Sequence, residues 1–318
     1  MTVSDHLDGD AAHLLLRTEA EVRSRASAAG VDPAPALAWR RRLCGGAGSD
    51  AWTQYDIDLR DDGAVQTWFD SDLAVTLRRI LAEADASEAI YVRKRPAIRL
   101  RLEHLSDPGR REVERSLASL AIRDDGITWR AGSYAPELAL HGGAHALALS
   151  HSFSTADTLA TLDFLRSGAS GAPEHSVGQL MRVFSLFVED RWELWDVWTR
   201  LAVLRDVPSA PDRWSSCASA PAALAWVVAD VDQVLAGSAT RDDHLSEVVE
   251  ALRPAAGDVA SGCYGLEVPI REVLPLWAVF HWNRMGFDLA MQRALIALVV
   301  TALTPLPSRA PTKPGASS

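Results

Sequence analysis

The sequence predicts an α+β fold, with an antiparallel or mixed sheet in the N-terminal half packed with a largely helical C-terminal half. Up to residue 133, segments with strand-like alternation take turns with amphipathic helical segments, which is typical of a sheet covered by helices. Beyond Gly143 almost every segment has helical periodicity. We expect a single domain over residues 1–304, followed by a disordered Pro/Ser/Gly-rich tail, 305–318.

The elements of the N-terminal half follow from caps, breakers and periodicity. Helices are expected at 13–28, 72–86 and 107–121, and strands at 50–60, within the basic stretch 91–102, and at 127–133. In the C-terminal half, helices are expected at 144–152, 156–166, 177–204, 219–236, 242–252, 269–282 and 288–303. Trp192, Trp195 and Trp198 follow each other at a spacing of three, and we expect them on one helix face, packed in the core.

The composition indicates a soluble, cytoplasmic protein. The 318 residues carry a net charge of −10, which argues against a general nucleic-acid binder. Cys44, Cys217 and Cys263 are widely spaced and indicate neither a disulfide framework nor a zinc site. Residues 1–12 are polar and unlike a signal peptide, and the apolar run 294–303 is too short to span a bilayer. We expect no nucleic-acid or membrane partner.

Motifs for common cofactors do not occur in the sequence. No GxGxxG follows a predicted strand, and the phosphate-loop, HExxH and GxSxG patterns are absent. We therefore expect no cofactor and no metal. Any chemistry has to come from three local clusters of polar residues, which lie within 91–102, 134–143 and 280–284.

The first cluster places five basic residues within 91–102 of an acidic chain. From Ile98 to Leu102 apolar and basic residues alternate, so a strand directs Ile98, Leu100 and Leu102 into the core. Arg99 and Arg101 then lie side by side on the other face, about 7 Å apart, and repel each other unless an anion or peptide carbonyl lies across them. The strand is either an exposed face paired with nearby acids or a binding surface.

The other two clusters contain groups suited to hydrogen bonding and proton transfer. Residues 134–143 begin with a tyrosine and end in paired glycines, which allow close backbone approach before a helix. Residues 280–284 crowd His281, Asn283 and Arg284 at one helix end between aromatic residues, where His281 could donate a proton. Each cluster taken alone is more often a packing site between helices.

Together, in their order and spacing, the clusters resemble the C-terminal, glutamate-elimination-type domain of class I lantibiotic dehydratases, and more closely its stand-alone thiopeptide relatives. The resemblance covers about residues 50–303. Its motifs are Trp52-Thr53-Gln54-Tyr55, Arg93-Lys94-Arg95-Pro96-Ala97-Ile98-Arg99-Leu100-Arg101, Tyr134-x-x-Glu137 ending in Gly142-Gly143, Phe153-x-x-x-Asp157-Thr158 and His281-Trp282-Asn283-Arg284. It implies the fold of that domain and a precursor peptide, leader plus core, as partner.

Departures from the family pattern distinguish its subtypes. Eliminating members carry an Arg and then an aromatic residue before the paired glycines, where this chain has Leu140 and His141. A leucine can neither bind a glutamyl carboxylate nor stabilise an enolate. The family's histidine four residues before the Asn is also replaced, by Val279, and His281 lies two residues before Asn283 instead. Such losses, with the rest of the motif retained, resemble the thiopeptide pyridine synthases.

The resemblance implies a formal [4+2] aza-cycloaddition between two dehydroalanines of an azole-containing peptide, with loss of water and of the leader to aromatise the ring. This chemistry calls for positioning and proton transfer, and no cofactor. The implied catalytic residues are His281, Asn283 and Tyr134. The implied substrate-binding residues are Arg93, Arg99, Arg101, Glu137, His141, Trp282 and Arg284.

Two alternatives stay open. The first is a glutamyl lyase that forms dehydroamino acids as the elimination subunit of a split dehydratase, and the retained Arg99 and Arg101 favour it. The second is a non-catalytic subunit that binds the precursor peptide and supports a separate dehydratase. The split dehydratase proteins are therefore candidate partners beside the precursor peptide.

Overall fold

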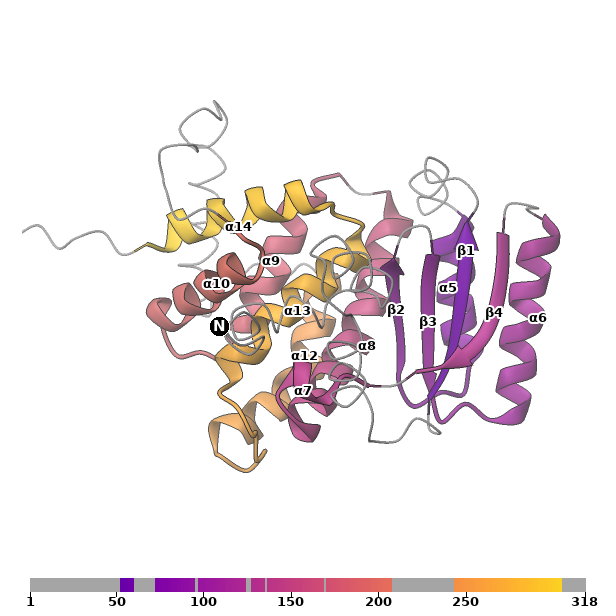
Figure 1. The fold of residues 1–318 in the computed structure, drawn as a ribbon, viewed down its shortest axis with the longest axis horizontal. Helices are drawn as coiled ribbons and strands as arrows, with labels where there is room; N and C mark the ends of the chain where they lie inside the picture. The colour runs from indigo at the N-terminus through magenta and orange to yellow at the C-terminus, as the bar shows by residue number, and fades with distance from the viewer. Residues whose placement is uncertain are drawn as a thin grey trace, which may run out of the picture.

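The computed structural model describes residues 52–59, 72–94, 97–123, 127–134, 136–168, 170–207 and 243–304. A four-stranded sheet with two helices forms one end of the described part, and the remaining helices form the other (Figure 1). The expected α+β class is confirmed. The helices expected at 13–28 and 219–236, and the expected tail, 305–318, lie outside the described residues.

Every strand pair of the sheet is antiparallel. The strands are β1 (Trp52–Leu59), β2 (Ala89–Lys94), β3 (Ala97–Glu103) and β4 (Ile127–Ser133), in the order β2-β3-β1-β4. The basic stretch expected as one strand thus forms two neighbouring strands, β2 and β3. Gln54 lies opposite Arg101, and Asp56 lies opposite Arg99. Because opposite residues of an antiparallel pair share a face, both arginines have polar neighbours across the sheet.

The helices are α5 (Asp72–Glu83), α6 (Asp107–Arg123), α7 (Leu138–His141), α8 (Ala144–Ser167), α9 (Ala172–Phe184), α10 (Arg191–Leu204), α12 (Asp243–Ala260), α13 (Ile270–Met285) and α14 (Leu289–Leu303). Helix α8 lies between the sheet and the other helices of the C-terminal half (Figure 1). It contacts β2 and α5 on one side and α12 and α13 on the other. This long helix therefore connects the two halves of the fold.

Two large apolar cores stabilise the described part, beside a small cluster of Trp52, Ile90, Val92 and Tyr134. Ile98, Leu100 and Leu102 of β3 are at most 1% exposed and pack with apolar residues of α5 and α6, as the alternation in the sequence predicts. The second core lies among α8, α9, α10, α12, α13 and α14. In it the rings of Phe153 and Trp277 stack at 4.6 Å between centroids.

Several helix boundaries differ from those expected. The segments 144–152 and 156–166 belong to one helix, α8, because no glycine or proline interrupts residues 153–155. The expected helix 177–204 divides into α9 and α10. Asp190 caps α10, where its carboxylate accepts a hydrogen bond from the Glu193 backbone N–H at 2.9 Å.

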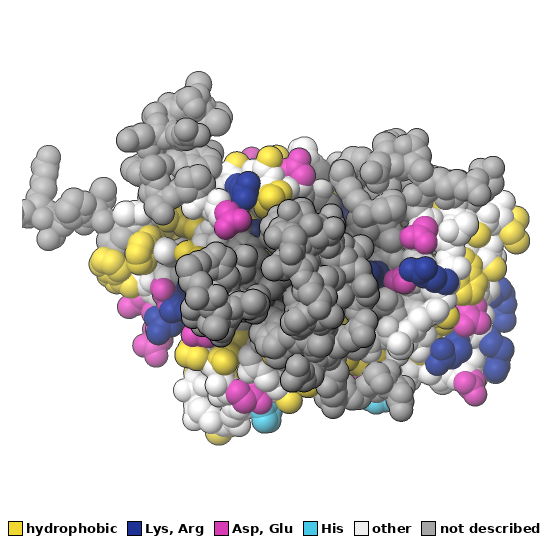
Figure 2. Space-filling model, viewed as in Figure 1, with side chains coloured by type: hydrophobic (Ala, Val, Ile, Leu, Met, Phe, Trp, Pro, Cys, Tyr) yellow, Lys and Arg dark blue, Asp and Glu magenta, His cyan; other side chains and the backbone are white. Residues whose placement is uncertain are grey.

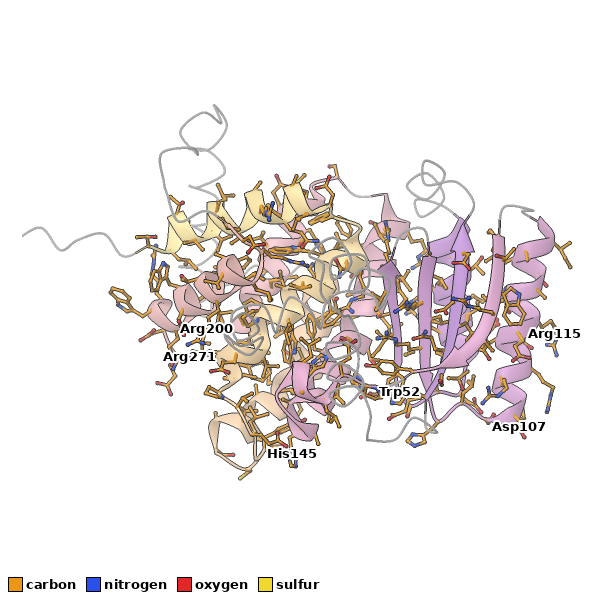
Figure 3. All side chains as sticks on the ribbon, in the orientation of Figure 1. Trp52, Asp107, Arg115, His145, Arg200 and Arg271 are labelled. Carbon is orange, nitrogen blue, oxygen red and sulfur yellow. The ribbon has the colours of Figure 1, made fainter. Side chains whose placement is uncertain are left out.

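The outer surface carries charges of both signs. Basic and acidic side chains lie beside each other at the α6 end of the face shown in Figure 2. At the opposite end Asp196 pairs with Arg200 at 3.0 Å and with Arg271 at 3.5 Å, and both arginines are labelled in Figure 3. Of the helices that the structure describes, none combines the length and apolar character needed to cross a bilayer.

Candidate active site

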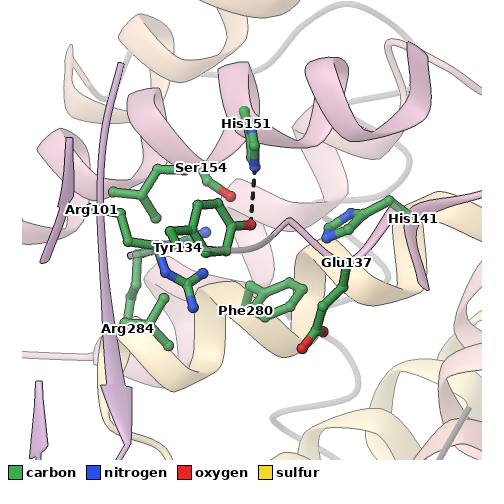
Figure 4. A pocket seen from close by; sticks show the side chains of 10 residues that line it. Arg101, Tyr134, Glu137, His141, His151, Ser154, Phe280 and Arg284 are labelled. Carbon is green, nitrogen blue, oxygen red and sulfur yellow. Dashed lines mark hydrogen bonds between the residues drawn. The ribbon is translucent and has the colours of Figure 1, made fainter. Parts of the chain in front are cut away.

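A pocket lies between the sheet and the helical half (Figure 4). The empty space between its lining atoms, part of it open to solvent, is about 520 Å³. Its walls come from β2, β3, the segment after β4, α7, α8 and α13. The lining residues are Ile90, Val92, Arg101, Tyr134, Glu137, His141, His151, Ser154, Phe280 and Arg284.

Arg101 and Tyr134 form the side of the pocket next to the sheet. The strand register holds Arg101, whose Nε donates a hydrogen bond to Gln54 Oε1 at 3.0 Å. Its guanidinium carbon lies 3.9 Å from the centre of the Tyr134 ring, a cation–π contact. Burial lowers the pKa of Arg101, yet a guanidinium stays protonated in proteins. The pocket therefore contains a fixed cation beside a phenol.

A glycine turn brings His141 to the pocket. Gly142 and Gly143 have φ values of 83° and 115°, which favour glycine. A Cβ atom on Gly142 would lie 2.3 Å from Val268 Cγ2, so the close approach of the chain also requires glycine. The turn ends α7 at His141, whose buried ring stacks on Phe280 at 5.7 Å between centroids.

A buried polar network lies next to the pocket around Asp157 of α8. Its carboxylate accepts hydrogen bonds from His281 Nδ1 at 2.7 Å, from Arg284 Nε and from the Gln179 amide. Burial alone would raise the pKa of Asp157, but the charge of Arg284 and the contact with His281 hold it well below its usual range. Asp157 is therefore ionised, and His281 Nδ1 carries the proton that it donates.

The other side of His281 is bonded as well. Its Nε2 lies 2.8 Å from Ser176 Oγ, which also accepts a hydrogen bond from the Trp282 indole at 2.9 Å. If the Ser176 hydroxyl donates to Nε2, every polar atom of the ring is paired in its neutral form. His281 and Trp282 are both 0% exposed.

Arg284 links this network to the pocket. Its Nε is bonded to Asp157, whereas Nη1 and Nη2, although buried, have no hydrogen-bond partner within the protein. A buried donor without a partner is costly. Arg284 also lines the pocket but is 0% exposed, so an oxygen atom of a bound molecule can accept from its free N–H groups once the side chains that cover them shift.

The charges around the pocket are balanced. Arg284 is paired with Asp157, and the negative charge of Glu137 acts on Arg101 by raising its pKa against the effect of burial. Burial, together with the charge of Arg101, lowers the pKa of His141 to about 3 and that of His151 to about 4, so both rings are neutral at neutral pH. The pocket presents strong donors without a net charge. Among the residues that the structure describes, no three His, Cys, Asp or Glu side chains gather as metal ligands.

Comparison with known proteins identifies the family. The family model described as the C-terminal region of the lantibiotic biosynthesis dehydratase matches residues 52–303. The chain belongs to this family. No curated protein sequence is a significant match.

The chain is also similar in fold to two solved structures. One is the tRNA-dependent lantibiotic dehydratase MibB from Microbispora sp. 107891, with a TM-score of 0.57 and 18% identity over 81% of this chain. The chain spans only 28% of MibB. The other is TbtD, the pyridine synthase from thiomuracin biosynthesis, with a TM-score of 0.55 and 15% identity over 79% of this chain and 97% of TbtD. At these identities the likeness establishes the fold.

The structure brings half of the candidate residues of this family member together. Those that line the pocket are Arg101, Tyr134, Glu137, His141 and Arg284. Arg93 and Asn283 lie instead around a second hollow with Gly286, on the other side of the last turn of α13. Arg99 faces Asp56, with Nε 3.5 Å from Oδ1, and Asp56 also pairs with Arg130 at 3.2 Å.

His281 differs from the expected placement. The resemblance implied that His281 is a catalytic residue, whereas the structure encloses its ring completely between Asp157 and Ser176. The reason is helical geometry: Phe280 and Arg284, four residues apart, share the face of α13 that lines the pocket, and His281 points about 100° away from Phe280 and about 60° away from Arg284. Trp282 is buried for the same reason.

Sequence reasoning missed His151, Ser154 and Phe280 as pocket residues. His151 and Ser154 lie three apart on α8, and Asp157 follows after three more residues. Each step of three turns about 60° around the helix, so polar residues at this spacing on a mostly apolar helix indicate a polar strip that winds from one face toward the next. That signal was present in the sequence, but the interruption expected after residue 152 concealed it.

Proposed function

We propose that this protein closes the central ring of a thiopeptide-type, ribosomally made antibiotic, by a formal [4+2] aza-cycloaddition between two dehydroalanines of an azole-containing precursor peptide. Water and the leader peptide then leave, and the ring becomes aromatic. The pocket beside Tyr134 is the proposed site. The family match and the fold shared with a pyridine synthase over 97% of that chain support the proposal.

The balance of charges in the pocket favours a neutral peptide amide over a glutamyl carboxylate as the substrate group. Asp157 neutralises Arg284, and Glu137 lies within the field of Arg101. A glutamyl carboxylate, which a lyase must bind, would add a negative charge to a site without a surplus cation. A peptide amide is neutral and offers a carbonyl oxygen to the free Nη groups of Arg284. The pocket therefore suits a dehydroalanine amide.

Proton transfer is the second requirement of the reaction. One amide must tautomerise to its imidic acid, which moves a proton from nitrogen to oxygen, before the diene can react. In this proposal the Tyr134 hydroxyl gives a proton to the carbonyl oxygen, and the Arg101 guanidinium stabilises the developing phenolate from 3.9 Å above the ring. The same hydroxyl later protonates the departing leader amide. Tyr134 is thus the proposed catalytic residue.

His281 and Asn283 act indirectly in this scheme. His281 fixes Asp157, which in turn fixes the Arg284 side chain, so His281 is a positioning residue. Asn283 Oδ1 lies 3.5 Å from the Gln292 amide, at the start of α14, and holds the two helices together. The apolar Ile90, Val92 and Phe280 provide surfaces for the vinyl and azole groups.

The test offers the purified full chain three peptides in separate reactions, followed by mass spectrometry. The first contains two dehydroalanines and azoles behind a leader, the second carries a glutamylated serine, and the third is the unmodified precursor. We expect a macrocycle and a released leader from the first peptide alone.

Each other outcome assigns a different function. Loss of glutamate from the second peptide, with no macrocycle from the first, would establish the lyase. Binding of any peptide by fluorescence anisotropy, without conversion of the first two, would identify a peptide-binding subunit of a separate dehydratase. Either result overturns the cyclase proposal.

A further inference from the structure

A line of polar groups extends from the pocket toward the outside of the molecule, behind Tyr134. The Tyr134 hydroxyl lies 3.2 Å from His151 Nε2, a hydrogen bond drawn in Figure 4. On the other side of the same ring, His151 Nδ1 lies 3.7 Å from Glu88 Oε2. The Glu88 side chain is 23% exposed and the His151 side chain 9%, and Tyr134 as a whole residue is 6% exposed. The three groups therefore connect solvent with the pocket.

The surrounding residues hold this arrangement in place. The Trp52 ring packs on His151 at 4.6 Å and against Tyr134 at 5.4 Å between centroids. The Ser152 hydroxyl donates to Glu88 Oε1 at 3.3 Å, which turns Oε2 toward His151. The phenol is hydrogen-bonded to the imidazole, and the carboxylate lies 3.7 Å from the other ring nitrogen, so an approach of about 0.5 Å lets the imidazole pass a proton between its two neighbours.

We propose that Glu88, His151 and Tyr134 form a proton relay that supplies the pocket, in which protonation of Glu88 decides where the Tyr134 hydroxyl points. The substrate of the relay rests on the proposed function, whereas the contacts that link Glu88, His151 and Tyr134 do not depend on it. Tyr134 is its catalytic residue, and His151 and Glu88 are positioning residues that act through it.

Hydrogen-bond matching gives the relay two states. A neutral imidazole has one donor and one acceptor nitrogen. When Glu88 is ionised, His151 Nδ1–H donates to it, so Nε2 accepts from the Tyr134 hydroxyl, which then points away from the pocket. When Glu88 is protonated, it donates to Nδ1, and Nε2–H donates to the Tyr134 oxygen. The Tyr134 O–H is then directed to the substrate.

One turnover of the relay balances its protons. The Tyr134 O–H bond breaks and its proton joins the substrate carbonyl oxygen. The His151 Nε2 proton restores the phenol and the Glu88 carboxyl proton moves to Nδ1, which leaves Glu88 ionised. The reverse sequence removes the amide N–H proton: the Tyr134 proton moves to Nε2, the Nδ1 proton returns to Glu88, and the phenolate takes the proton from the substrate nitrogen, so every group of the relay regains its starting state. No oxidant, reductant or co-reactant takes part.

The environment of Glu88 suits such a switch. Burial, followed by the charge of Glu103 on β3, raises the pKa of Glu88 to about 7, against which the Ser152 hydroxyl on α8 acts weakly. Burial, followed by the charge of Glu88, raises the pKa of Tyr264, which lies after α12. His151 stays neutral over the same range, because burial and Arg101 lower its pKa to about 4. The carboxyl therefore titrates while the ring changes tautomer.

The tautomer of His151 tests the wiring without any substrate. In the full chain labelled with ¹⁵N-histidine, the His151 signals are assigned by their loss in His151→Gln. We expect the two ring nitrogens to exchange donor and acceptor character between about pH 5.5 and 8.5, as an imidazole next to a titrating group does. Glu88→Gln should abolish this change, and Glu83→Gln, which alters an exposed carboxylate on α5, should leave it intact. If the ¹⁵N chemical shifts of the two His151 ring nitrogens stay constant over this pH range in the parental protein, the relay is wrong.

The pH dependence of the single-turnover rate tests the relay in catalysis. With the azole-containing dehydroalanine peptide, the parental rate should fall above a midpoint near pH 7, and Glu88→Gln should remove that midpoint. Glu103→Gln should shift the midpoint downward, because the neighbouring charge is gone. An unchanged profile in both variants would contradict the relay. Absence of turnover by the parental protein would refute the cyclase proposal. The histidine spectra would still show whether Glu88 sets the tautomer of His151.

Discussion

Two arginines on β3, two residues apart, have different surroundings. Arg99 lies 3.5 Å from Asp56, whereas Arg101 binds Gln54 and lines the pocket. The alternation in the sequence predicted that both share the face opposite the core. It could not predict which of them has an acidic partner, because Asp56 lies opposite Arg99 on one side and opposite Arg130 on the other only through the pairing of distant strands. The paired-arginine interpretation fits Arg99, and the binding interpretation fits Arg101.

This difference predicts unequal effects of two matched substitutions. Arg101→Ala should weaken binding of the precursor peptide about tenfold or more, since a lost charge-assisted hydrogen bond costs about 1.5–3 kcal/mol. Arg99→Ala is the control and should change affinity less, because its charge is already used by Asp56. Fluorescence anisotropy with labelled peptide measures both. Equal losses in the two variants would mean that the peptide lies across the whole strand face.

Asp157 predicts a large and pH-dependent effect on stability. Asp157→Asn leaves the buried Arg284 without its counter-charge, which should lower the free energy of unfolding by about 3–5 kcal/mol at pH 7. The folded-state pKa of Asp157 lies below 3.8, the value for an unperturbed group. Its carboxylate therefore stabilises the fold above about pH 4, and this contribution is lost as the pH falls further.

Urea unfolding at several pH values measures this prediction. The difference in the free energy of unfolding between Asp157→Asn and the parental protein should become smaller below about pH 4. Asp163→Asn, on the same helix, is the control, because its partners Arg78 and Arg166 are partly exposed and such pairs contribute about 0–1 kcal/mol. Similar destabilisation by the two substitutions would show that Asp157 is an ordinary helix carboxylate.

At the scale of elements, the Gly142–Gly143 turn sets the position of α7 relative to α8. Gly142→Ala should destabilise the protein by about 1–3 kcal/mol, because the new Cβ meets Val268 at 2.3 Å and φ is 83°. Gly168 has a similar φ of 65°, but nothing lies within 4 Å of a Cβ added there, so Gly168→Ala should lower the stability less. Thermal unfolding compares them. A larger loss from Gly168→Ala would show that the turn is not closely packed.

Local patterns predicted most elements but misplaced some boundaries. The Asp190 and Glu193 pair that begins α10 is a capping signal visible in the sequence, and the long expected helix concealed it. A spacing of three also does not keep residues on one helix face, because each step falls about 60° short of a full turn. Trp192 is accordingly 58% exposed while Trp198 is 0% exposed.

For the whole molecule, the sequence predicted the fold class and half of the proposed site residues. What it could not predict depends on packing between distant segments. Asp157 meets Arg284 across 127 residues, and Glu88 reaches His151 from a different half of the fold. Which side of α13 faces the pocket is likewise fixed by its contacts with β2, α8 and α9. Residue spacing alone therefore identified the motif at 281–284 but not the side chains within it that line the pocket.

The most direct test of the account is the single-turnover rate of macrocycle formation by Tyr134→Phe at saturating peptide. The substitution removes one oxygen atom and keeps the ring, which faces the Arg101 guanidinium and meets the Trp52 ring edge to face. We predict a rate about 10²–10⁴-fold below the parental rate, with peptide affinity and melting temperature close to the parental values. A variant that forms the macrocycle at the parental rate would contradict the assignment of catalysis to this pocket.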